Sequence, residues 1–161
     1  MHALMMNTPL MISSILKHAE KNFPEVEMVS VTVDHPRHRQ NNRIFARRCR
    51  QLANVLESLG AAFGDRIGTL AWNDFRHMEL YYAVSGSGMV CHTINPKLFP
   101  EQVAYIINHA EDKILFVDVL VLPLLEALSE HLAKVEIIVV LTERTHMPES
   151  NLPNLLCYEE L

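Results

Sequence analysis

Short apolar segments alternate with amphipathic segments through the middle of this chain, and this alternation constrains the fold more than any other feature. The apolar segments are β-rich, whereas the segments between them carry apolar residues at helical spacing. Buried strands alternating with helices imply right-handed crossovers and a mostly parallel sheet flanked by helices. The predicted fold class is therefore α/β. The expected strands are 66–71, 89–94, 114–117 and 137–141, and the expected helices are 74–85, 100–110 and 122–132.

Both ends of the chain add further predicted elements. Thr8 suits a helix cap and Pro9 the first helical position. Valines alternating with polar residues after Pro24 predict a strand, and a later helical pattern ends at Gly60, which suits a C-terminal cap. The expected segments are a flexible start over 1–8, a helix over 9–22, a strand over 26–33, a polar loop over 34–42, a helix up to Gly60, and a loop-like end over 147–161 in which 155–158 fits a short last strand.

Composition and charge narrow the class of protein. Of the 161 residues, 49% are hydrophobic and 20% are charged, which suits one globular unit with a real core, so residues 1–161 are interpreted as a single domain. The net charge is −5, and a chain of this charge repels phosphate backbones. Nucleic acid is therefore not an expected partner.

The cysteines and the most apolar run indicate in which cellular compartment the protein is expected. Cys49, Cys91 and Cys157 lie far apart without a CxxC pair, which favours free thiols and a reducing environment. The run 117–128 contains charged residues and a proline, and it is shorter than the roughly 20 residues that a spanning helix needs. We expect no transmembrane segment and a cytoplasmic protein.

The residues that follow each predicted strand are the natural place to look for a ligand site, because open parallel sheets bind ligands there. None of these segments has the glycines of a phosphate-binding loop. Asn73 or Asp74 is expected to cap the next helix rather than contact a ligand, and Trp72 to pack at the rim. The glycines of 86–88 fall where a helix ends, so they indicate a plain turn.

Candidate metal ligands and catalytic acids are also scattered. His35 and His38 fall in the predicted polar loop, while Cys91 and His92 are neighbours on a strand and point to opposite faces. No metal site is predicted. The acids sit at positions expected to be exposed, with no paired-carboxylate or triad pattern: Glu57, Asp65, Glu79 and Glu101.

Six arginines fall between positions 37 and 50, and Arg43, Arg47 and Arg50 share one helical face. Such a face could meet phosphate or an acidic partner. No aromatic residues interleave with the arginines to stack on bases, so a solvated face is the favoured interpretation.

An ordered succession of segments resembles a known family. It begins with Gln-Leu-Ala-Asn at 51–54 and Gly-Asp-Arg-Ile at 64–67, and it continues through Leu-Ala-Trp-Asn at 70–73 and Glu-Leu-Tyr-Tyr-Ala at 79–83. Further matches are Val-Cys-His-Thr-Ile-Asn-Pro-Lys-Leu-Phe-Pro-Glu-Gln at 90–102, Ala-Tyr-Ile-Ile-Asn-His-Ala at 104–110 and Phe-Val-Asp at 116–118. From about residue 11 to residue 160, the chain resembles the start of acyl-CoA synthetases, which are adenylate-forming ligases, and in particular their medium- and long-chain fatty-acyl branch.

The resemblance implies a parent enzyme that activates a fatty acid with ATP and magnesium and transfers the acyl group to coenzyme A. It also places Leu161 upstream of the family's Ser/Thr- and Gly-rich phosphate loop, its later ATP- and adenylate-binding motifs and its carboxy-terminal lysine. The expected assignment is therefore a truncated acyl-CoA synthetase, a partial AMP-binding domain without catalytic, cofactor-binding or metal-binding residues of its own, and inactive alone.

Two alternatives stay open at this point. The first is a non-enzymatic α/β interaction module that associates with a separate remainder of the enzyme or with a relative, through apolar surface that the missing parts leave exposed. The second is a small receiver-like or flavodoxin-like domain, which would want an acidic cluster or a phosphate loop after the first parallel strand.

Two departures from the family pattern predict local changes. At 41–44 the chain reads Asn-Asn-Arg-Ile, which lacks the family's aromatic anchor and the acidic first turn that suits a helix dipole, so a frayed or rebuilt helix start is expected. At 86–89 it reads Gly-Ser-Gly-Met, which is expected to perturb packing.

Overall fold

A computed structural model describes residues 6–161, and the predicted flexible start over 1–8 therefore lies largely outside the described residues. Five parallel strands form the main sheet in the order β4-β3-β5-β6-β7. This confirms the predicted α/β class. The strands are β3 (Arg66–Leu70), β4 (Val90–Thr93), β5 (Ile114–Val117), β6 (Ile137–Val140) and β7 (Leu155–Cys157), the last of which matches the short strand expected over 155–158.

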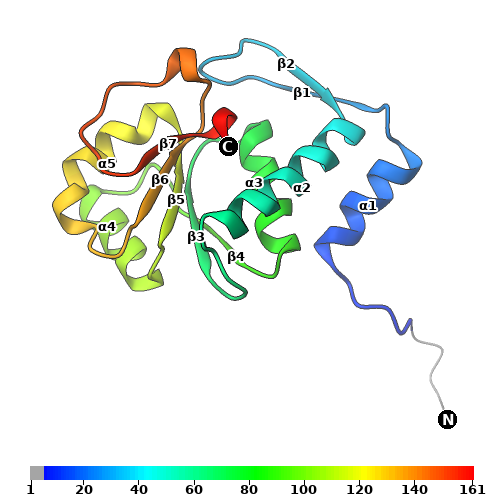
Figure 1. Cartoon of the computed structure of the whole chain (residues 1–161), viewed down its shortest axis with the longest axis horizontal. Helices are drawn as coiled ribbons and strands as arrows, with labels where there is room; N and C mark the ends of the chain where they lie inside the picture. The colour runs from blue at the N-terminus through cyan, green and yellow to red at the C-terminus, as the bar shows by residue number, and fades with distance from the viewer. Residues whose placement is uncertain (1–5) are drawn as a thin grey trace.

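Helices cover both faces of this sheet (Figure 1). The central strand β5 is buried on both sides: Leu115 packs with the helices of one face and Phe116 with those of the other. One apolar cluster fills the α4 and α5 face, and a second fills the α2 and α3 face. The helices are α1 (Ile12–Asn22), α2 (Asn42–Ser58), α3 (Phe75–Gly86), α4 (Pro100–Ala110) and α5 (Leu122–Leu128), which is shorter than predicted because a 3₁₀ turn replaces its end at Ser129–His131.

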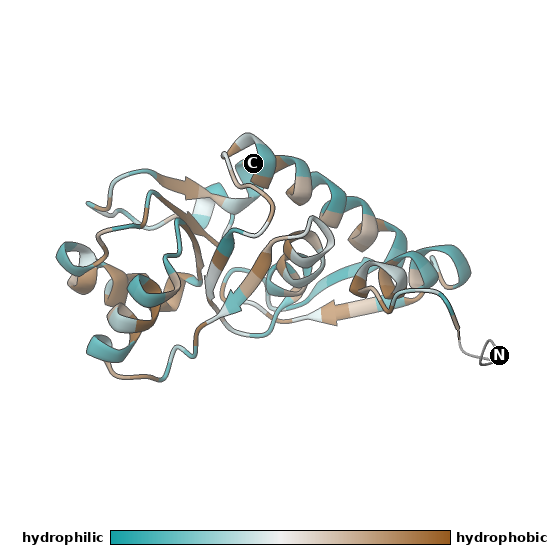
Figure 2. Cartoon of the chain, turned by 90° about the horizontal axis from the view of Figure 1, so that it is seen from below, coloured by the Kyte–Doolittle hydropathy of each residue, from teal (hydrophilic) through white to brown (hydrophobic). Residues whose placement is uncertain are grey.

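A separate two-stranded antiparallel hairpin crosses one end of the sheet (Figure 1). Its strands are β1 (Glu27–Ser30) and β2 (His38–Asn41). The predictions of one strand over 26–33 and a loop over 34–42 are therefore wrong in their boundaries. Every residue of β2 is hydrophilic (Figure 2), so neither alternation nor apolarity marks it as a strand.

The first helix agrees with its prediction at the C-terminal end but not at the N-terminal end. The helix ends as expected at Asn22, but it begins at Ile12 rather than at Pro9, and its N-cap, Met11, supplies no side-chain hydrogen bond. Helix α1 packs against α2 and α3 on the outside of the molecule (Figure 1), and it contains no fully buried residue.

The start of α2 is capped, so of the frayed or rebuilt start expected from its unusual sequence, the structure shows the rebuilt one. The side chain of Asn41 accepts a 3.0 Å hydrogen bond from the backbone N–H of Ile44, and the Asn42 amide donates to the carbonyl of Phe23 at 2.8 Å. The N-cap asparagine thus satisfies one of the backbone N–H groups that lack a partner within the helix.

The turn after α3 contains a glycine that the backbone requires. Gly88 has a φ of +78°, a region that side chains with a Cβ rarely adopt, and the Phe63 ring lies over it. Met89 is buried beside this turn. The sequence 86–89 therefore ends α3 by an ordinary glycine turn.

Candidate functional site

The carboxyl edge of the parallel sheet is where a ligand site is expected, and its polar side chains are bonded to their own backbone. Asp74 accepts a 2.8 Å hydrogen bond from the N–H of His77, which confirms the predicted cap. Asp118 accepts from Leu120 at 2.9 Å. Burial raises the pKa of both carboxyls, and the negative charge of Asp74 adds to the effect on Asp118.

His77 and Trp72 complete the rim of this edge. The Nδ1 of His77 lies 3.1 Å from the Trp72 carbonyl, which can only accept, so Nδ1 carries the proton and the hydroxyl of Thr69 donates to Nε2 at 3.0 Å. Burial lowers the pKa of His77. Trp72 is partly exposed with the ammonium of Lys97 5.8 Å from its ring centroid, as a rim residue would be.

Beside this edge lies a buried ionic network that the sequence did not predict. Its centre is Arg76, whose side chain is fully buried. The two terminal nitrogens of Arg76 each lie 2.9 Å from a carboxylate oxygen of Asp34, and Nε donates to Glu159 at 2.8 Å. Asp34 comes from the hairpin loop and Glu159 from the turn that follows β7, so one guanidinium joins three distant segments.

Arg48 and Glu79 extend the network between α2 and α3. Arg48 Nε donates to Glu79 at 2.7 Å, and its two terminal nitrogens reach Glu159 at 3.1 Å each. Glu79 was predicted to be exposed, and this is wrong: its side chain is fully buried. Burial raises the pKa of Glu79, and the charge of Arg48 opposes that shift.

The remaining arginines of the 37–50 segment behave as the sequence indicated. Arg43, Arg47 and Arg50 are exposed. Arg50 pairs with Glu20 at 2.7 Å, so acids of the same chain neutralise part of this face. Arg48 could have been recognised as different, because it lies three residues after Phe45 and four before Leu52, at the edge of the buried stripe of α2.

A groove runs between the hairpin and α3. It has a volume of about 540 Å³ and is walled by apolar side chains with a few polar ones among them. His38 stacks on Phe75 with ring centroids 3.6 Å apart, which fixes β2 against the start of α3. The main lining residues are Met28, Val29, Gln40, Phe75, Met78 and Tyr81.

Of the histidines and cysteines considered as metal ligands, His35 and His38 lie close together, with ring centroids 5.8 Å apart. His35 pairs with Glu143 at 2.7 Å, whereas His92 of β4 pairs with Asp112, which lies between α4 and β5, at 2.7 Å. Across residues 6–161, no three His, Cys, Asp or Glu side chains gather as metal ligands. All three cysteines are free thiols.

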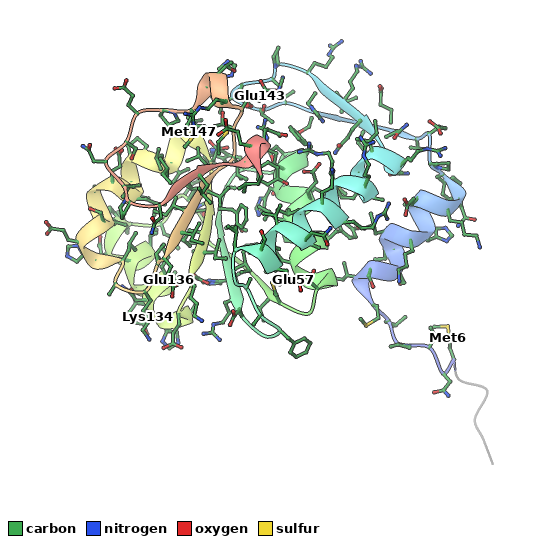
Figure 3. All side chains as sticks on the ribbon, viewed as in Figure 1. Met6, Glu57, Lys134, Glu136, Glu143 and Met147 are labelled. Carbon is green, nitrogen blue, oxygen red and sulfur yellow. The ribbon has the colours of Figure 1, made fainter. Side chains whose placement is uncertain are left out.

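The two ends of the sheet differ in character. Glu143 lies at the end that the hairpin crosses, whereas Lys134 and Glu136 lie at the opposite end (Figure 3). Three polar side chains at the carboxyl end take part in caps and in the ionic network: Asp74, Asp118 and Arg76.

Comparison with known proteins shows the family to which this sequence and fold are similar. The model of the AMP-binding enzyme family matches residues 16–156. The 3-methylmercaptopropionyl-CoA ligase of Ruegeria lacuscaerulensis is 47% identical over 98% of this chain, and the medium-chain-fatty-acid–CoA ligase of Ectopseudomonas oleovorans is 42% identical over 98%. In three dimensions, a structure described as a long-chain-fatty-acid CoA ligase from Rhodopseudomonas palustris covers 94% of the chain with a TM-score of 0.76 at 16% identity, and the chain covers 36% of it.

Fold and sequence together define a parallel α/β segment of the CoA-ligase type. The chain belongs to the AMP-binding enzyme family. It spans 29% of the length of each of the two ligases named above. None of the helices within 6–161 is long and apolar enough to cross a membrane.

Proposed function

We propose that this chain is a truncated acyl-CoA synthetase, a partial AMP-binding domain whose parent reaction is the ATP-dependent activation of a fatty acid and its transfer to coenzyme A. The observation that carries the proposal is 42–47% identity over nearly the whole chain to proteins named as CoA ligases. ATP, magnesium and coenzyme A belong to that parent reaction. We place the protein in the cytoplasm, in keeping with its free thiols.

The second part of the proposal is that the chain contributes scaffold and no catalytic, cofactor-binding or metal-binding residue. Its polar groups at the carboxyl edge already serve the fold, as Asp74 and Arg76 illustrate. Phosphoryl and acyl-adenylate chemistry depends on groups that position and neutralise phosphates, and a scaffold without them does not catalyse it.

The direct test is turnover and binding by the purified chain. After circular dichroism has shown that the chain is folded, it is incubated with ATP, magnesium, octanoate and coenzyme A, and acyl-CoA formation is followed. Titration calorimetry with ATP-magnesium, and separately with a non-hydrolysable acyl-adenylate analogue, measures binding. We expect neither product nor heat. Turnover would disprove the inactive-scaffold assignment.

A non-enzymatic interaction module is the second candidate, and one observation favours it. Helix α1 has no fully buried residue, and the segment around its start exposes a row of apolar side chains. Large exposed apolar surface on a monomer usually marks an interface. The most exposed of these side chains are Leu10, Met11, Ile12 and Ile15.

Complementation distinguishes the two candidates. The chain is mixed with the Ectopseudomonas oleovorans ligase from which the matching segment of 157 residues has been deleted. Restored acyl-CoA formation, with co-elution on size exclusion, would support association with a separate remainder. A folded monomer that neither co-elutes nor restores activity would leave the scaffold fragment as the better description.

A further inference from the structure

The carboxylate of Asp34 is surrounded by hydrogen-bond donors in the way that a bound carboxylate ligand is surrounded in a binding site. Its carboxylate receives two 2.9 Å hydrogen bonds from Arg76, one of 3.1 Å from the backbone N–H of Glu143, and one of 3.3 Å from the hydroxyl of Thr142. Within the hairpin itself, Thr32 also donates to it at 2.6 Å. A bidentate guanidinium with extra donors is the arrangement that recognises a carboxylate most strongly.

Arg76, the main donor to Asp34, is also held in place by contacts that do not involve Asp34. Arg76 also donates to Glu159 at 2.8 Å and to the carbonyl of Leu141 at 3.2 Å, and its guanidinium lies 4.7 Å from the centroid of the Phe75 ring. Thr142 is fully buried. Arg76 is therefore held in place independently of Asp34, and this preorganisation favours binding of a replacement carboxylate.

The site lies where open α/β sheets take their ligands. Thr142 and Glu143 lie just beyond the carboxyl end of β6, after Leu141, and Arg76 sits in the first turn of α3, which follows β3. Asp34, by contrast, belongs to the loop of the separate hairpin, 42 residues from Arg76 and 108 from Thr142. The hairpin thus inserts a carboxylate into the edge of a sheet with which its strands do not pair.

We propose that Arg76, Thr142 and the N–H of Glu143 form a carboxylate-binding site, and that Asp34 is its built-in ligand, which docks the β1–β2 hairpin. Docking closes one wall of the groove against α3, since Met28 and Val29 of the hairpin line that groove together with Phe75. This inference is independent of the proposed enzymatic origin of the chain and would hold for a scaffold or for an interaction module.

Chemical rescue tests the site. The variant Asp34→Gly removes the ligand and leaves room for a small carboxylate. Loss of one partner of a buried ion pair should lower the Tm of the chain by roughly 6 to 20 °C. Sodium formate at a hundredfold excess over its Kd should then restore about 5 °C or more, measured against sodium chloride at the same ionic strength. If Asp34→Gly is unfolded in chloride, formate should restore its helical circular dichroism.

Two further variants make the test specific. Glu27→Gln removes a carboxylate from the same hairpin, but from a half-exposed pair with Arg39, and should change neither the Tm nor the response to formate. In the double variant Asp34→Gly with Thr142→Val, formate should rescue less. Equal effects of formate and chloride on a folded Asp34→Gly chain would overturn the proposal.

A measurement on the chain with Asp34 intact covers the case in which Asp34→Gly folds in neither salt. The carboxyl of Asp34 is titrated by NMR, and docking predicts that its pKa lies well below the usual range because Arg76 stabilises the charged form. The pKa should rise in Thr142→Val. An ordinary pKa in both proteins would mean that no carboxylate is bound in this site.

Discussion

The hydroxyl of Tyr158 donates a 2.7 Å hydrogen bond to the buried carboxylate of Glu79, from a position 79 residues further along the chain. Burial raises the pKa of the Tyr158 phenol well above its ordinary value, so the hydroxyl stays protonated and keeps donating. This bond and the Arg76–Glu159 pair fasten the turn after β7 to α3. That turn is therefore anchored in the core.

Replacing Tyr158 by phenylalanine removes only that hydroxyl. We expect Tyr158→Phe to lower the free energy of unfolding by about 1–3 kcal/mol, because one oxygen of Glu79 is left buried without a partner. Urea unfolding followed by the fluorescence of Trp72, the single tryptophan, measures the change. Tyr105→Phe is the matched control, since Tyr105 is 66% exposed and should lose almost nothing. Equal losses in the two variants would contradict the role of the bond.

Arg48 and Arg47 are neighbours on α2 with opposite environments, which allows a second comparison. Arg48→Met leaves Glu79 without its guanidinium partner and should cost about 3–5 kcal/mol at neutral pH. Arg47 is exposed, so Arg47→Met should change the free energy of unfolding by less than about 0.5 kcal/mol.

The loss in Arg48→Met should shrink as the pH falls. Without the positive charge, the pKa of Glu79 rises further, and protonation in the folded state then relieves the buried charge. The difference in unfolding free energy between Arg48→Met and the parent chain, measured in urea from pH 7 to pH 5, should therefore decrease. A constant difference would mean that Arg48 acts through packing alone.

Acid sensitivity of the parent chain follows from the two carboxyls that contact Arg76. Hydrogen bonds and charge from Arg76 lower the pKa of Asp34 and of Glu159 in the folded state, against the desolvation that opposes them. Their stabilisation is complete above the unfolded values of about 3.9 for Asp and 4.3 for Glu, and it is lost as the pH falls toward the folded values. We expect the free energy of unfolding to drop below about pH 5. Asp34→Asn should reduce this slope, and an unchanged slope would assign the acid sensitivity to other groups.

How far the sequence predicts this molecule depends on the range of the interaction. The parallel sheet was predictable because strands such as β5 and β6 are short apolar runs between helical segments, and the cap at Asp74 because capping is a local rule. The strand β2 was not, because its four residues are all polar and it pairs through backbone groups whose preference the side chains do not reveal.

The ionic network escaped prediction for a related reason. Glu79 and Arg76 lie on α3, a helix most of whose residues are buried, yet nothing near them in the sequence signals that burial. Their partners are distant in sequence: Asp34 lies in the hairpin loop, and Glu159 lies in the turn that follows β7. Long-range pairing of charged groups depends on the assembled fold, which local patterns do not encode.

Three glycines allow the cost of a left-handed backbone to be separated from the cost of contact. Gly60 and Gly88 have φ values of +85° and +78°, but a Cβ at Gly60 meets nothing within 4 Å, whereas one at Gly88 would meet the Phe63 ring at 2.5 Å. Phe63 is 88% exposed, so its ring can turn away. We therefore expect Gly60→Ala and Gly88→Ala to cost the same, about 1–2 kcal/mol each, from backbone strain. Gly86→Ala, in open space at the end of α3, should be neutral or stabilising by up to about 1 kcal/mol.

Urea unfolding of the three variants measures these costs. A fourth variant identifies the cause of any difference between Gly88→Ala and Gly60→Ala. If Gly88→Ala costs over about 1 kcal/mol more than Gly60→Ala, the Phe63 ring is held in place despite its exposure. Adding Phe63→Ala to Gly88→Ala should then remove the excess, because the ring is the nearest obstacle to the new Cβ. An excess that survives in the double variant would place the strain in the backbone between α3 and β4, where Gly88 follows the C-cap Ser87 and Met89 enters the core.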